Sequence, residues 1–189
     1  MPKTTGRLLV TIVVAAVLSG CGSNLNDPDH PATEEDIAHA EAMMRELPAA
    51  EDTERQLAAT VRQIADAAKT VAPALDWQVH PDRGMNQLGC PSPYLEADGV
   101  SFTTDRLISS VPISDTEWAA VLPLARDVAT REGMTSLTVQ ADKPGRHDVI
   151  LHSPDHGNEI RLGTDKAALL TGTTGCRFRA DDPRRHGAN

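Results

Sequence analysis

The stretch from residue 136 to residue 171 decides the fold, and it reads SLTVQADKPGRHDVILHSPDHGNEIRLGTDKAALLT. Apolar and polar residues alternate on either side of short polar connections, which is typical of half-buried β-strands. The connection at 143–146 (KPGR) suits a type II turn, 155–158 supplies a second turn, and 163–166 supplies a third. The sequence therefore predicts an antiparallel meander of four strands, of which the last covers 167–171.

Two helices are predicted near the start of the folded region. Thr33 and Asp36 form a capping box, and apolar residues then recur on one face until Pro48, which predicts a helix over 34–47. A second helix is expected from about Thr53 to the residue before Pro73, because its apolar residues alternate steps of four and three. These residues are Leu57, Val61, Ile64, Ala68 and Val71. Fewer than three heptads are present, so this face favours core packing over a coiled coil.

A third helix opens at the capping box formed by Ser114 and Glu117. Pro123 lies inside it and predicts a kink or a restart, and Gly133 is the expected stop. The region between the second and third helices is rich in Pro, Gly, Asp and Asn, with short strands expected at 76–79 and 100–102. Together these elements predict an α+β fold, an antiparallel β meander packed by helices on one face.

The N-terminus carries an export and lipidation signal. Lys3 and Arg7 precede an uncharged, mostly apolar run at 8–18, which is too short to span a bilayer and matches a secretory signal. Leu18-Ser19-Gly20-Cys21 then looks like a lipobox, so residues 1–20 are predicted to be a signal peptide and Cys21 the lipidated first residue of the mature protein. We expect a lipid-anchored protein on the extracytoplasmic side of the cell membrane.

The predicted domain plan follows from this signal. Residues 21–33 form the lipidated cysteine and a polar, proline-broken tether, and residues 34–178 form a single α+β domain. Residues 179–189 are a charged tail that is expected to fray.

The net charge and the amino-acid composition limit the classes of molecule that the protein can bind. The chain has 18 basic and 27 acidic side chains, for a formal net charge of −9. Removal of residues 1–20 takes away Lys3 and Arg7 and no acid, so the exported chain carries about −11. An acidic surface repels nucleic acid, which is excluded as a partner. With two Trp, one Tyr and two Phe, the core is expected to be aliphatic.

The remaining cysteines are Cys90 and Cys176, and in an oxidising compartment they are expected to form one disulfide. Metal ligation and a reactive thiol are the alternatives, although neither cysteine sits in a C-x-x-C pattern or beside a histidine pattern. Closing a loop between positions 86 apart would stabilise the fold by about 4–5 kcal/mol in the chain-entropy model.

No stretch carries a recognised catalytic motif. The histidines at 147, 152 and 156, beside Asp148 and Asp155, suggest a metal site. Residues five apart on a strand point to opposite faces, however, which separates His147 from His152 and leaves only His152, Asp155 and His156 around a turn. We predict that these three are solvated turn residues and not metal ligands. Glu159 and Arg161 share a strand face and are expected to form a surface or rim ion pair, with a role in ligand binding as the alternative.

Short motifs occur in an order that carries a family resemblance. They are the lipobox, Leu88-Gly89-Cys90, Arg131-Glu132-Gly133, His147-Asp148-Val149, Gly157-Asn158-Glu159-Ile160-Arg161 and Thr174-Gly175-Cys176. In this order the chain resembles the LppA-like family of mycobacterial lipoproteins. The resemblance implies an envelope lipoprotein, agrees with pairing the two cysteines, and supplies no catalytic residue.

The sequence thus predicts a non-enzymatic envelope lipoprotein without a cofactor, held to the membrane by its N-terminal lipid. Its expected partner is an envelope protein or a small ligand. The alternative is an envelope hydrolase, which would gather perturbed acidic or histidine groups in a cleft.

Overall fold

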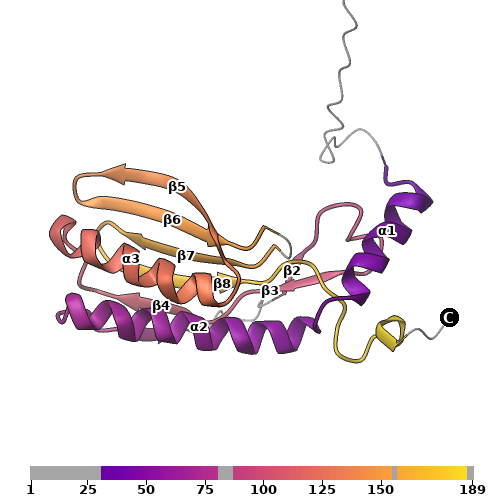
Figure 1. Ribbon diagram of the computed structural model, residues 1–189, viewed down its shortest axis with the longest axis horizontal. Coiled ribbons are helices and arrows are strands. Elements are labelled where there is room, and N and C mark those ends of the chain that lie inside the picture. Colours follow the sequence, from indigo (N-terminus) through magenta and orange to yellow (C-terminus); the bar gives the residue numbers. More distant parts are fainter. Residues whose placement is uncertain (1–30, 81–86, 155–156, 187–189) are drawn as a thin grey trace, which may run out of the picture.

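The computed structural model describes residues 31–80, 87–154 and 157–186 of the chain (Figure 1). The described elements, in chain order, are α1 (Glu34–Arg45), α2 (Ala50–Val71), β1 (Gln78–His80), β2 (Gln87–Gly89), β3 (Val100–Phe102), β4 (Arg106–Ser109), α3 (Asp115–Arg131), β5 (Ser136–Lys143), β6 (Arg146–His152), β7 (Glu159–Thr164), β8 (Ala168–Thr173) and the 3-10 helix η1 (Pro183–His186). The predicted signal peptide, Cys21 and most of the predicted tether lie outside the described residues.

The main sheet has six strands in the order β1-β4-β8-β7-β6-β5, and every neighbouring pair is antiparallel. The predicted meander is confirmed, since β5, β6, β7 and β8 follow one another in chain and in space. The sequence pattern did not show that β4 adds to the sheet beside β8, with β1 outside it.

Helices α2 and α3 lie side by side over one face of this sheet, as Figure 1 shows. The inward side chains of the strands, such as Val149, Leu162 and Leu170, pack against the apolar stripes of both helices to form the main core. The predicted α+β class, with helices on one face, is confirmed. The core is mostly aliphatic, because Trp118 is its only fully enclosed aromatic side chain among the described residues.

Both predicted capping boxes are present. The Thr33 hydroxyl accepts the Asp36 N–H while the Asp36 carboxylate accepts the Thr33 N–H, and Ser114 and Glu117 make the same exchange. α3 continues through Pro123 without the restart that the sequence suggested. It ends as predicted before Gly133, whose φ of +80° favours a residue without a side chain.

The hairpin turns agree with the sequence at one position and differ at another. Gly145 has a φ of +73°, as the third position of a type II turn requires. The turn predicted at 163–166 begins two residues later, because Gly163 and Thr164 still pair with β6 and β8. In addition, the Thr164 hydroxyl accepts the Ile113 N–H at 2.8 Å, which holds this end of β7 against the start of α3.

A smaller second layer of structure lies beyond the end of the main sheet. β2 and β3 form a two-stranded sheet, and Val100 of β3 also pairs with Arg177. Beside it, α1 packs through Ala40 and Met44 on Ala97 and Phe178, an apolar cluster separate from the main core. α1 therefore belongs to this second layer and not to the helical cover of the sheet (Figure 1).

The C-terminal segment corrects the expectation of a frayed tail. Over residues 179–186 it folds back on α1, where Arg184 stacks on the Phe178 ring at 4.6 Å and pairs with Glu41 at 3.2 Å and with Asp182 at 2.7 Å. The Arg184 guanidinium lowers the pKa of the Asp182 carboxyl below its ordinary value. Charged residues order this segment because their partners lie on α1 and on the loop before β3, far away in sequence.

Candidate functional site

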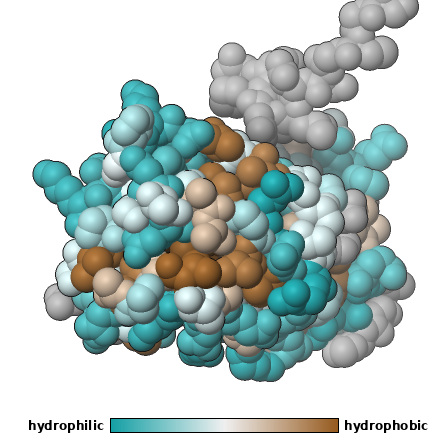
Figure 2. All heavy atoms as spheres, turned by 60° about the vertical axis from the view of Figure 1, so that its left-hand side comes forward, coloured by the Kyte–Doolittle hydropathy of each residue, from teal (hydrophilic) through white to brown (hydrophobic). Residues whose placement is uncertain are grey.

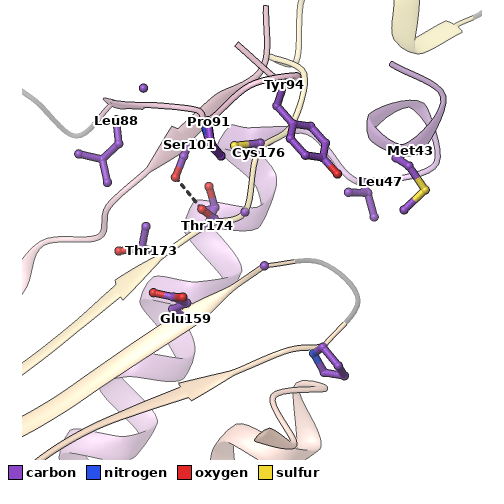
Figure 3. Close-up of a pocket in the computed structure, with 14 residues that line it drawn as sticks. Met43, Leu47, Leu88, Pro91, Tyr94, Ser101, Glu159, Thr173, Thr174 and Cys176 are labelled. Atoms are coloured by element: carbon purple, nitrogen blue, oxygen red, sulfur yellow. Dashed lines mark hydrogen bonds between the residues drawn. The ribbon is translucent and has the colours of Figure 1, made fainter. Parts of the chain in front are cut away.

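A partly apolar hollow of about 500 Å³ forms a cleft where the two layers meet. α1 forms one side, β2 and the loop after it form another, and the ends of β7 and β8 form the floor (Figure 3). The lining residues are Met43, Leu47, Leu88, Gly89, Pro91, Tyr94, Ser101, Pro154, Gly157, Glu159, Thr173, Thr174, Gly175 and Cys176. We refer to this hollow as the cleft.

The disulfide between Cys90 and Cys176 closes one wall of the cleft. Its two Cα atoms are 5.9 Å apart, and it joins the residue after β2 to the segment that follows β8. The pairing is the one expected from the sequence. Because the bond ties a loop with little core of its own to the end of the sheet, it fixes the distance across this wall.

Hydrogen bonds inside the fold engage two hydroxyl groups of the cleft lining, those of Ser101 and Thr174. The Ser101 hydroxyl donates to the Thr174 carbonyl at 2.6 Å, and the Thr174 hydroxyl accepts the Phe102 N–H at 2.9 Å (Figure 3). These two hydroxyls are engaged within the fold, whereas Tyr94, Glu159 and Thr173 supply the other polar side chains that line the cleft.

A buried arginine supports the floor of the cleft. Arg177 is 1% exposed, and its guanidinium donates to the Asn158 side-chain oxygen at 2.8 Å. The same oxygen accepts the Gly175 N–H at 3.1 Å, so Asn158 connects the buried charge to the cleft wall. Burial lowers the pKa of Arg177 to about 10, and the group remains a cation at neutral pH.

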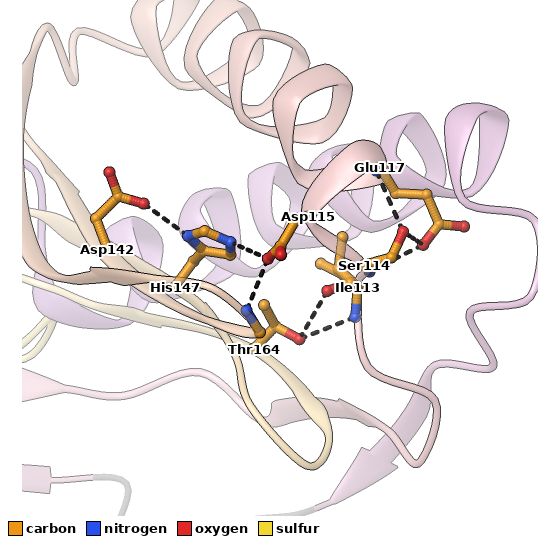
Figure 4. A network of polar contacts seen from close by, with 8 residues as sticks. Ile113, Ser114, Asp115, Glu117, Asp142, His147 and Thr164 are labelled. Carbon is orange, nitrogen blue, oxygen red and sulfur yellow. Dashed lines mark hydrogen bonds and ion pairs between the residues drawn. The ribbon is translucent and has the colours of Figure 1, made fainter.

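His147, which the sequence pattern placed on a strand, lies in β6 and is buried. His147 is 8% exposed and stacks on Trp118 with ring centroids 4.8 Å apart. Its Nδ1 lies 2.8 Å from the Asp142 carboxylate and its Nε2 lies 2.9 Å from the Asp115 carboxylate (Figure 4). Hydrogen bonds from the Gly145 N–H and from His147 hold the pKa of Asp115 below its ordinary value.

This cluster braces α3 against the β5–β6 hairpin. Both ring nitrogens of His147 face carboxylate oxygens, which leaves neither free to coordinate a metal ion. No group of three or more potential metal ligands occurs among the residues that the structure describes. His152 lies on the opposite face of β6, as strand geometry predicted, whereas Asp155 and His156 lie outside the described residues.

The predicted ion pair between Glu159 and Arg161 is wrong. Arg161 pairs across the sheet with Asp148 of β6, with Nε donating to Oδ1 at 2.9 Å, because Ile150 and Arg161 are register partners and Asp148 is their near neighbour. Glu159 is left at the end of β7, where it lines the cleft. Sequence spacing alone could not choose between a partner on the same strand and one on the next.

The residues that line the cleft were not predicted as a site, because they come from five separate stretches of sequence. A signal was nevertheless present in the resemblance. The segments at 88–90, 157–161 and 174–176 belong to the motifs of the LppA-like resemblance, and all three contribute residues to the cleft. The segments at 131–133 and 147–149 lie elsewhere.

The surface is largely hydrophilic, in keeping with the net charge of −9. Figure 2, which brings the left-hand end of Figure 1 forward, shows apolar side chains gathered within a mainly hydrophilic face. Two of the exposed large apolar side chains, Met43 and Leu88, belong to the cleft. None of the helices in the described residues is long and apolar enough to cross a membrane.

A family model described as "LppA: Lipoprotein confined to pathogenic Mycobacterium" matches residues 25–180. The chain belongs to the LppA family. Comparison with curated proteins gives no match. The predicted resemblance is thus confirmed, and membership in an LppA lipoprotein family supports association with a membrane.

Two solved structures resemble the chain. The lipoprotein LppA from Mycobacterium tuberculosis is 22% identical with a TM-score of 0.65, over 80% of this chain and 92% of that one, which shows a shared fold. A DUF4853 family protein from Actinomyces odontolyticus ATCC 17982 is 15% identical with a TM-score of 0.46, over 73% of each chain.

Proposed function

We propose that this LppA-family chain is a non-enzymatic envelope protein, anchored by lipid on Cys21 to the outer face of the cytoplasmic membrane, and that it binds a small ligand in the cleft. The observation that carries the proposal is the cleft itself. Its volume of about 500 Å³ falls in the usual range of small-ligand sites, roughly 300–1,000 Å³.

The walls of the cleft favour binding by a preformed site. The disulfide fixes one wall, and backbone and side-chain hydrogen bonds around Thr174 and Asn158 fix the floor. A site that is held in place before the ligand arrives loses little conformational entropy on binding. Exposed apolar surface at Met43, 40% exposed, and Leu88, 41% exposed, is then covered by the ligand.

A photo-crosslinking experiment in cells tests the site with the whole lipoprotein. A benzophenone amino acid replaces Leu88 in the cleft, and a matched chain carries it at Val139, which is 54% exposed on the edge strand β5. After irradiation, mass spectrometry of the purified chain should show a small-molecule adduct at position 88 and none at 139. Equal adducts at both positions, no adduct at 88, or only protein adducts at 88 would refute the proposal.

The anchor is tested separately. Cys21→Ala should abolish incorporation of a clickable fatty-acid analogue and partitioning into the detergent phase, because no other residue is positioned for acylation. Cys90→Ser is the control, since it also removes a cysteine but leaves the lipobox intact. Label retained by the Cys21→Ala chain would disprove the anchor.

A further inference from the structure

The charge inside the cleft points to the kind of ligand. Glu159 is the only charged side chain among the described residues that line the cleft, and it is exposed. Within the described part of the chain its carboxylate has no hydrogen-bond or ion-pair partner, since Arg161 is engaged by Asp148. An ionised carboxylate beside apolar walls favours a cationic hydrogen-bond donor.

The apolar surface surrounds this carboxylate. In Figure 3, Met43 and Leu47 stand on one side, Leu88 stands on the other, and Glu159 lies below at the end of β7. A ligand that contacts both apolar sides therefore passes close to the carboxylate. Such a ligand combines a long apolar portion with one charged group.

We infer that the cleft binds a single-chain membrane amphiphile whose head carries a protonated amine, with the chain between the apolar sides and the ammonium paired with Glu159. This inference rests on the proposed function and names its ligand class. An anionic amphiphile is disfavoured both by Glu159 and by the net charge of −9 on the whole chain.

The size of the cleft agrees with this ligand. A dry cavity of about 150 Å³ lined by apolar side chains holds one benzene molecule. A cleft of about 500 Å³ therefore has room for roughly three times as many atoms, which accommodates a chain of a dozen carbons and its head.

The position of the cleft favours the membrane as the source. Residues 22–30 separate Cys21 from the first described residue, so this connection reaches at most about 35 Å. α1 begins at Glu34 and supplies Met43 to the cleft, and Leu47 follows two residues after the helix ends. The cleft is thus held close to the bilayer surface that would supply the amphiphile.

The test uses the whole chain after the anchor, Gly22–Asn189, which contains both apolar clusters and the disulfide. Titration calorimetry below the micellar concentration compares dodecylamine with dodecanol, dodecanoate and n-butylamine. Dodecylamine should bind most tightly and dodecanoate and n-butylamine least. Glu159→Gln should lower the affinity for dodecylamine about tenfold, which corresponds to the loss of one charge-assisted hydrogen bond. The affinity for dodecanol should stay within about twofold of the wild-type value. Glu96→Gln is the matched control, because this exposed carboxylate lies on the loop that borders the cleft without lining it.

A second variant separates failure of the ligand class from failure of the site. Leu88→Ser should lower the affinities for dodecylamine and dodecanol by a similar factor. An unchanged melting temperature of this variant shows that the chain still folds. Equal affinities for dodecylamine and dodecanoate, with no effect of Glu159→Gln, would refute recognition of an amine head group. The cleft would remain the binding site. If Leu88→Ser changes no affinity, the cleft is not the site, and both this inference and the proposed function fall. If n-butylamine binds as tightly as dodecylamine, the apolar chain contributes nothing to binding, and the inference that the ligand is a membrane amphiphile is refuted.

Discussion

Replacing Gly172 by alanine should destabilise the protein, because the added Cβ would collide with the side chains of Leu57 and Thr104. A Cβ on Gly172 of β8 would lie 2.7 Å from Cγ and 2.8 Å from Cδ2 of Leu57, and 3.2 Å from Cγ2 of Thr104. Leu57 is 3% exposed within the main core, and the clash involves its branching carbon. Relief therefore requires α2 to move away from β8, which a close-packed interior resists.

The magnitude follows from two opposing effects. Alanine restricts the unfolded chain and would stabilise by about 0.4–1 kcal/mol where the backbone accepts it. Overpacking of a filled core costs about 1–3 kcal/mol. We expect a net loss of about 1–2 kcal/mol in the free energy of unfolding, which corresponds to a fall in melting temperature of about 3–8 °C for a domain of this size.

Urea unfolding of the Gly22–Asn189 chain, followed by tryptophan fluorescence, measures this loss. Gly89→Ala is the matched control, because a Cβ there meets no atom within 4 Å, and it should be neutral or slightly stabilising. A cycle with Leu57→Ala, which alone costs about 2–5 kcal/mol, should show that the double variant loses about 1 kcal/mol less than the sum. A Gly172→Ala chain as stable as the wild type, or strictly additive losses, would refute the reasoning.

Three further outcomes are expected. Cys90→Ser and Cys176→Ser should each lower the free energy of unfolding by up to about 4–5 kcal/mol, because the bond closes a loop between positions 86 apart, and the double variant should lose little more. Two freely alkylated thiols in the oxidised native protein would contradict this. The Ser114 hydroxyl and N–H hold the pKa of Glu117 below its ordinary value, so the carboxylate stabilises the fold above the unfolded pKa of about 4.3, and that contribution is lost as the pH falls through the lower folded pKa. The urea midpoints of wild type and Glu117→Gln should therefore differ at pH 6 and converge near pH 3. A difference between the midpoints that does not change with pH would contradict stabilisation by the Glu117 carboxylate. Finally, Arg184→Met should make residues 179–186 sensitive to proteases while the melting temperature of the main core changes little, since its partners Glu41, Asp98 and Asp182 all lie in the second layer. Lys143→Met, on an exposed hairpin position, is the control for loss of charge.

The parts of the fold that the sequence predicted are those with local causes. Alternation over 136–171 defines four strands joined by short turns, and each turn fixes an antiparallel neighbour. The capping boxes at Thr33 and Ser114 likewise act within one helical turn. Local signals of this kind are readable without knowledge of what packs against them.

The parts that the sequence missed depend on partners distant along the chain. Arg184 looks like a solvated tail residue until Glu41 and Phe178 are placed beside it. The burial of His147 depends on Trp118, which stacks on its ring. Arg161 pairs with Asp148 on the neighbouring strand and not with Glu159, because the register of the sheet brings Asp148 beside it. The cleft belongs to the same class, because its sides come from α1, β2, β7 and β8.

The separate apolar cluster under α1 has a mechanical consequence. A pull applied at residue 31 acts first on α1, which is joined to the rest of the molecule by four residues, 46–49, and by the contacts around Met44 and Phe178. Those contacts are few compared with the main core, so under load α1 should peel away as one unit while the six-stranded sheet stays intact. Tension along the predicted tether would then remove Met43 from one side of the cleft and open it while the six-stranded sheet stays folded.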